Sequence, residues 1–165
     1  MVLALLEAMR PRQWTKNVFV FAGVVFAGRL GDRAAVAMSL AAFAIFCLLS
    51  GSVYIINDLA DAGQDRAHPT KRHRPVASGR LPAALAKGGA VALIVVCLGA
   101  SFALPVAFRL LAAAYLALNL VYSFRIKHVV ILDVLAIAVF FVLRAAAGAA
   151  AIGVEISHWL LICTI

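Results

Sequence analysis

Long apolar runs separated by short polar stretches are the feature that most constrains the fold of this chain. Hydrophobic residues make up 65% of the sequence and charged residues 13%, and the mean hydropathy is +1.05. A soluble domain is about half apolar and about a quarter charged. Since a spanning helix needs about 20 mostly apolar residues, we expect an all-α, polytopic transmembrane helix bundle over residues 1–165. Its five complete spans would fall near residues 17–30, 34–56, 83–103, 110–122 and 129–152.

Another apolar run begins at Trp159 and continues to Ile165, where the sequence ends. Seven residues are too few to cross a membrane. We therefore expect this run to be the start of a sixth span, and the chain to be the truncated, N-terminal portion of a longer membrane domain.

The distribution of basic residues predicts the orientation in the membrane. The formal charge is +8, and most of the 15 Lys and Arg residues fall on one side of the predicted spans. Basic residues collect on the cytoplasmic side and near anionic lipid headgroups. We therefore expect a multi-pass protein of a bacterial-type plasma membrane, with a cytoplasmic N-terminus. No basic aromatic surface is visible, so nucleic acid is not an expected partner.

The first polar stretch, residues 57–82, would lie in the cytoplasm after the second span. Asn57 opens it, and Asp58, Asp61 and Asp65 follow. Carboxylates at positions i, i+3 and i+7 share one face of a helix. Such acids repel one another, and Mg²⁺ is usually held by a few carboxylates together with phosphate oxygens. The spacing therefore favours a Mg²⁺ site, to which Asn57 can add an amide oxygen. The alternative is a solvated loop whose acids only pair with nearby bases.

Basic residues follow the acids in the same stretch, at Lys71, Arg72 and Arg74. Arginine makes bidentate contacts to phosphate, and lysine acts as a point charge. Acids for a metal followed by bases for phosphate indicate a site for a diphosphate. The alternative is that these bases anchor the loop to anionic lipid.

The second polar stretch, residues 122–128, precedes the fifth predicted span. Tyr122 and Lys127 either bind substrate or serve as interfacial anchors. Asp133 and Arg144 lie within the span, where a charged side chain is costly and usually has a partner or a function. They are separated by roughly 16 Å along a helix axis, so they cannot pair directly. Arg144 either binds an anionic group of a substrate or pairs with a helix beyond this sequence.

Several of these segments carry a family resemblance. The pattern Asn57-Asp58-x-x-Asp61-x-x-x-Asp65, followed by RPVASGRLP at residues 74–82, resembles the first aspartate-rich motif and adjoining loop of the UbiA superfamily of intramembrane prenyltransferases. Three further segments resemble the decaprenyl-phosphate phosphoribosyltransferase branch of that superfamily. They are RPRQWTKN at residues 10–17, HPTKRHRP at 68–75 and FVLRAAAG at 141–148. The first of these segments contains Lys16, a further candidate for substrate binding.

The resemblance implies a helical bundle, normally of nine spans, around a central cavity open to the cytoplasm and sideways to lipid. Members hold a diphosphate leaving group with Mg²⁺ on two aspartate-rich motifs. By this resemblance Asp58, Asp61 and Asp65 are the catalytic, metal-binding residues. The residues expected to bind substrate are Lys16, Asn57, Lys71, Arg72, Arg74, Tyr122, Lys127, Asp133 and Arg144. The second motif normally follows the sixth span, so we expect the chain alone to be inactive.

Three functions follow from these patterns. The leading expectation is an enzyme that transfers 5-phosphoribose from 5-phosphoribosyl 1-diphosphate, a soluble donor, to decaprenyl (polyprenyl) phosphate, a lipid acceptor, for cell-wall biosynthesis. The first alternative is a prenyltransferase that moves a prenyl group from its diphosphate to an aromatic or lipid acceptor. The second is a non-enzymatic membrane protein that binds lipid headgroups. The sequence leaves the oligomeric state open.

Overall fold

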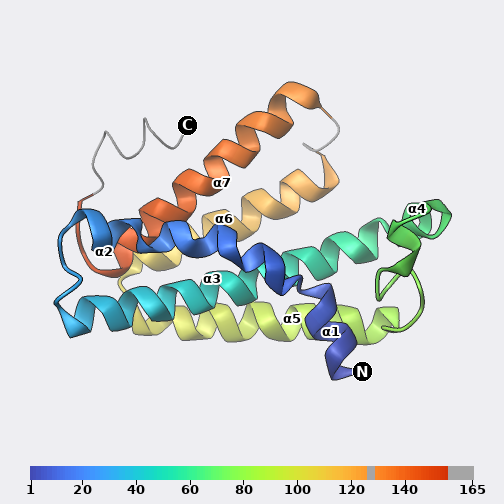
Figure 1. Ribbon diagram of the computed structural model, residues 1–165, viewed down its shortest axis with the longest axis horizontal. Helices are drawn as coiled ribbons and strands as arrows, with labels where there is room; N and C mark the ends of the chain where they lie inside the picture. The colour runs from blue at the N-terminus through green and yellow to red at the C-terminus, as the bar shows by residue number, and fades with distance from the viewer. Residues whose placement is uncertain (126–128, 156–165) are drawn as a thin grey trace.

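Four long α-helices form the frame of the computed structural model, which describes residues 1–125 and 129–155 (Figure 1). They are α3 (Arg33–Ala60), α5 (Ala83–Ala100), α6 (Val106–Phe124) and α7 (Val130–Ala151). Each is long and apolar enough to cross a membrane, α5 together with the 3-10 turn η3 (Ser101–Ala103) that extends it. No strand occurs among the described residues. The prediction of an all-α transmembrane bundle is confirmed.

The first apolar segment is helical but is built from short pieces. After α1 (Val2–Ala8), the 3-10 helix η1 (Pro11–Phe21) leads into α2 (Ala22–Phe26). None of these pieces belongs to the four helices long enough to cross a membrane. Arg10, between α1 and η1, has a left-handed backbone with φ of 52°, so the chain turns sharply there. The predicted start of a sixth span lies outside the described residues.

Close contact between η1–α2 and α7 depends on two glycines. A Cβ added at Gly148 of α7 would overlap the carbonyl oxygen of Val20, and one at Gly23 would lie 2.7 Å from backbone atoms of Ala149. A 3-10 helix is narrower than an α-helix, which suits this approach. Edge-to-face packing of Phe19 on Phe141 continues the contact. The N-terminal segment is therefore held against α7.

The core lies where α3, α6 and α7 meet. Phe46 and Phe108 are fully buried, and Tyr115 is almost so. The ring of Tyr115 packs against Phe46 at 5.0 Å and against Phe140 at 5.8 Å between centroids. Aromatic pairs at such distances contribute about 0.5–1.5 kcal/mol beyond the area they bury. This cluster fixes the three helices around the cavity described below.

The first polar stretch begins with a break in the helix. Asp61 separates α3 from the short helix α4 (Ala62–Ala67), and a 3-10 turn, η2 (Lys71–His73), follows. The C-terminus of α3 and the N-terminus of α7 lie toward the same end of the bundle (Figure 1). The start of the first polar stretch and the described residues of the second, 122–125, thus lie toward one end of the bundle, as the sequence predicts.

Candidate active site

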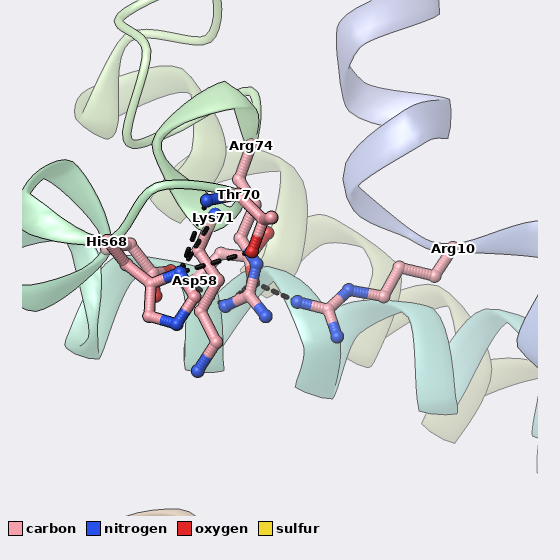
Figure 2. A network of polar contacts seen from close by, with 7 residues as sticks. Arg10, Asp58, His68, Thr70, Lys71 and Arg74 are labelled. Carbon is pink, nitrogen blue, oxygen red and sulfur yellow. Dashed lines mark hydrogen bonds and ion pairs between the residues drawn. The ribbon is translucent and has the colours of Figure 1, made fainter.

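Two buried aspartates form an ion-pair cluster at the end of α3. Asp58 is 1% exposed and Asp65 3% exposed. Arg10 donates from Nη2 to Oδ1 of Asp58 at 2.5 Å. Arg74 donates from Nη1 to Oδ2 of Asp65 at 2.7 Å, and the same nitrogen lies 3.4 Å from Oδ1 of Asp58. Figure 2 shows Arg10 and Arg74 approaching Asp58 from different segments. We call these four residues the acid–arginine cluster.

The three aspartates do not form one continuous row on a helix. Asp61 is the C-cap of α3, with its backbone N–H donating to the carbonyl oxygen of Asn57 at 2.9 Å. With the helix interrupted there, one carboxylate oxygen of Asp58 and one of Asp65 both lie near Nη1 of Arg74. Within residues 1–125 and 129–155, no three His, Cys, Asp or Glu side chains gather closely enough to hold a metal ion. The structure therefore joins two of the predicted ligands, and Asp61 occupies the turn between them.

A cavity of about 230 Å³ lies between α3, α6, α7 and the N-terminal segment. Asn57 lines it, and the Oδ1 atom of this residue is buried without a hydrogen-bond partner in the described part of the chain. Four of the residues expected to bind substrate line the cavity, together with several that were not expected to. The lining consists of Lys16, Ser50, Val53, Tyr54, Asn57, Tyr115, Asn119, Tyr122, Ile137, Phe140, Phe141 and Arg144.

The missed residues carry a recognisable signal. Tyr115, Asn119 and Tyr122 stand at i, i+4 and i+7 of a span, so they share one face of α6. A polar row on one face of an otherwise apolar membrane helix indicates a face that avoids lipid. This pattern is visible in the sequence and would have identified the cavity wall.

Arg144 is the buried cation of the cavity, with 6% of its surface exposed. Nε donates to Oδ1 of Asn17 at 2.8 Å, Nη1 to the carbonyl oxygen of Phe140 at 2.9 Å, and Nη2 to the hydroxyl of Tyr115 at 2.8 Å. Asn17 in turn donates to Oγ of Ser50 at 3.2 Å. None of the ion pairs found among the described residues involves Arg144. Its partners are neutral, so its charge is not balanced there.

Asp133 has a different partner. The hydroxyl of Tyr122 donates to its Oδ1 at 2.6 Å. The bond joins α6 to α7 beside Tyr122, which lines the cavity, and satisfies a carboxylate that would otherwise be costly in a span. Lys127, the other member of the predicted tyrosine–lysine pair, lies outside the described residues.

The other basic residues of the stretch 57–82 either lie exposed on its surface or bind it to neighbouring segments. Lys71 and Arg72 are exposed on η2 and do not line the cavity. Nδ1 of His68 accepts from the backbone N–H groups of Thr70 and Lys71 (Figure 2). Arg80 makes two bonds of 2.8 Å to the carboxylate of Glu7, and this guanidinium lowers the pKa of Glu7 below its ordinary value. The loop is thus tied to α1 on one side and to α3 on the other.

Comparisons with known proteins identify the family of the chain. Residues 17–165 match the model of the UbiA prenyltransferase family. The decaprenyl-phosphate phosphoribosyltransferases of Corynebacterium glutamicum and Mycolicibacterium smegmatis are each 41% identical, over 96% and 98% of this chain. The match covers 49% and 52% of those proteins, so the chain spans about half the length of the curated relatives it matches.

A solved structure shares the fold. The UbiA homologue from Archaeoglobus fulgidus, whose structure contains DMAPP and Mg²⁺, superposes with a TM-score of 0.80. It is 22% identical, and the alignment covers 97% of this chain and 58% of that one. At this identity the likeness concerns the fold alone. The family match extends over nearly the whole sequence, and the chain therefore belongs to the UbiA prenyltransferase family.

Proposed function

We propose that the protein containing this chain is a Mg²⁺-dependent transferase that moves 5-phosphoribose from 5-phosphoribosyl 1-diphosphate to decaprenyl (polyprenyl) phosphate. The relatives at 41% identity carry the name of that activity. The observation in this molecule that carries the proposal is the pair of buried carboxylates that converge on one nitrogen of Arg74, close to a cavity lined by Lys16 and Arg144.

The acid–arginine cluster fits a magnesium ion. Oxygens of Asp58 and Asp65 lie 3.4 and 2.7 Å from one nitrogen of Arg74, so a positive group already stands between them. Mg²⁺ prefers oxygen ligands and is usually held by one or two carboxylates, with water and substrate phosphates completing its shell. Asp58 and Asp65 would hold the ion, and Oδ1 of Asn57, which has no hydrogen-bond partner among the described residues, would add an amide oxygen. Asp61, in the turn between the two, stays the third predicted ligand. The bound metal would neutralise charge on the departing diphosphate.

The chain's own residues contribute charge and position. As diphosphate leaves, C1 of the ribose gains cationic character, and groups that stabilise charge only in the transition state accelerate such a step. Arg74, which already lies between Asp58 and Asp65, would supply positive charge for the diphosphate, and the exposed Lys71 and Arg72 would add to it from the adjoining turn. The acceptor phosphate is already anionic and needs no strong base, so its placement governs the attack on C1.

The location of the site follows from the same proposal. Soluble phosphorylated donors and Mg²⁺ are available in the cytoplasm, and basic residues concentrate near the end of the bundle that carries residues 57–82. The positive-inside rule then favours a cytoplasmic N-terminus and an acid–arginine cluster on the cytoplasmic face of a plasma membrane.

The test is a donor comparison with the full-length protein in membrane vesicles containing Mg²⁺. We expect diphosphate release with 5-phosphoribosyl 1-diphosphate and a polyprenyl phosphate together. Release only with a prenyl diphosphate would contradict the proposal and favour the prenyltransferase alternative. Equal activity of wild type and Asp65→Asn with every donor would favour a non-enzymatic, headgroup-binding role.

A further inference from the structure

The guanidinium of Arg144 is held in one orientation while part of it remains available. An arginine has five N–H donors, and the bonds to Asn17, Phe140 and Tyr115 use three of them, one on each nitrogen. Arg144 also lies over the rings of Tyr115 and Phe141, at 5.0 and 5.5 Å from their centroids. Its side chain lines the cavity. Among the residues that the structure describes, one N–H on each terminal nitrogen is left for a further acceptor.

A buried cation of this kind needs an anion. Removing an unpaired charge from water costs several kcal/mol, and the described partners of Arg144 are all neutral. Lys16, whose neighbour Asn17 orients Arg144, lines the same cavity and adds a second positive charge. Two cations line the cavity, and within residues 1–125 and 129–155 no carboxylate pairs with Arg144, which favours an oxyanion of the ligand.

This end of the cavity is separate from the acid–arginine cluster. Asn17 bonds both Arg144 and Ser50, which places the guanidinium near the level of Ser50 on α3. Asn57, beside the cluster, lies seven residues further along α3, or about 10 Å along the helix axis. The cavity therefore extends from Asn57, which is next in sequence to Asp58 of the cluster, to the guanidinium of Arg144. A ligand with anionic groups at both ends fits it.

We propose that Arg144, assisted by Lys16, binds the 5-phosphate of the donor and so selects a phosphorylated sugar over a prenyl diphosphate. The inference rests on the proposed function, which places the donor's diphosphate at the acid–arginine cluster. A pentose with phosphates at C1 and C5 presents an anion to each end of the cavity. A prenyl chain would instead place hydrocarbon against the unpaired N–H groups of a buried guanidinium, which is unfavourable.

Tyr115 and Asn17 act through Arg144. Each accepts a hydrogen bond from it, and neither carries charge, so they orient the guanidinium without neutralising it. In this proposal they are positioning residues, and Arg144 is the residue that determines specificity.

The decisive experiment pairs two donors with two proteins. Full-length wild type and Arg144→Gln are assayed with 5-phosphoribosyl 1-diphosphate and with ribosyl 1-diphosphate, which lacks the 5-phosphate. We expect the wild type to lose at least 100-fold in kcat/KM when the 5-phosphate is absent, and Arg144→Gln to lose less than fivefold. The ratio is taken within each protein, so partial misfolding of the variant cancels.

Further measurements separate the other outcomes. Arg144→Lys should restore part of the preference, and KM for the polyprenyl phosphate should change less than threefold. Arg109→Gln, an arginine that stacks on Phe102 and does not line the cavity, is the matched control and should keep the wild-type ratio. An unchanged ratio in Arg144→Gln would overturn the inference, as would a rise in KM confined to the acceptor. A wild type that uses only prenyl diphosphates would instead contradict the proposed function.

Discussion

The acid–arginine cluster and the Arg144 end of the cavity show two ways of burying charge in one membrane protein. In the cluster, Asp58 and Asp65 are each matched by an arginine from another segment. Around Arg144 the partners are an amide, a carbonyl and a phenol. The first site balances charge within the protein, and the second orients a charge without balancing it.

The difference is that the charges of the cluster already have partners within the protein, whereas the charge of Arg144 has none among the described residues. The matched charges tie the segment around Arg10 and the loop at Arg74 to the end of α3. Breaking a buried pair by removing one partner leaves an uncompensated charge, at a cost of about 3–5 kcal/mol. The guanidinium of Arg144 is held in one orientation and keeps N–H groups without an acceptor among the described residues, which suits it to bind an anionic group of a ligand. The variants below test this distinction.

The largest effect is expected from Asp65→Asn in the full-length protein. The change removes one of the two charges that face the cation position, so Mg²⁺-dependent turnover should fall roughly 100-fold or more, as when a group that stabilises transition-state charge is lost. Initial rates across a Mg²⁺ titration measure it. Asp32→Asn is the matched control, because Asp32 caps the opposite end of α3 and asparagine caps equally well. Wild-type turnover in Asp65→Asn would reduce the cluster to a purely structural device.

Gly148→Ala should destabilise the fold through the contact that positions Asn17 and Arg144. The added Cβ meets the carbonyl oxygen of Val20, and overpacking of this kind costs about 1–3 kcal/mol. Thermal unfolding in detergent should show a lower midpoint. At Gly99 a Cβ meets no atom within 4 Å, so Gly99→Ala should leave the midpoint unchanged or raise it slightly. Equal midpoints for both variants would show that the approach of η1 to α7 is not tight.

Tyr115→Phe should have a smaller and more selective effect. It removes the hydroxyl that accepts from Nη2 of Arg144 and keeps the ring that packs on Phe46. One hydrogen bond to a charged group contributes about 1.5–3 kcal/mol, and part of that is regained if the guanidinium finds another acceptor. We expect a rise of roughly tenfold in KM for the donor, with kcat and the KM of the acceptor nearly unchanged. A fall in kcat alone would place Tyr115 in the chemical step instead.

The sequence was sufficient for the family, the helical class and the membrane location, because these depend on local patterns. The long apolar runs became α3, α5, α6 and α7. The pairing of Asp58 with Arg10 was not predicted, because it joins residues 48 positions apart. The 3-10 form of the segment before Phe21 was not predicted either. It suits the close contact with Gly148 of α7, and a contact between distant segments leaves no periodicity in the sequence. Local signals identify elements, and the charge partners follow from how the elements pack.

The smallest effect is expected where charges are matched but exposed, at Glu7 and Arg80. Surface pairs contribute little and are screened by salt, so Glu7→Gln should change turnover less than twofold. Arg80 lowers the pKa of Glu7 below 4.5. A group whose pKa is depressed by folding adds stability above its unfolded pKa and loses it as pH falls through the folded value. The docking of α1 on the loop should therefore weaken below pH 4.5 in wild type. The distance between spin labels on α1 and on the loop measures this docking. Glu7→Gln should show no such transition, and one that persists would show that the Glu7–Arg80 pair is not its cause.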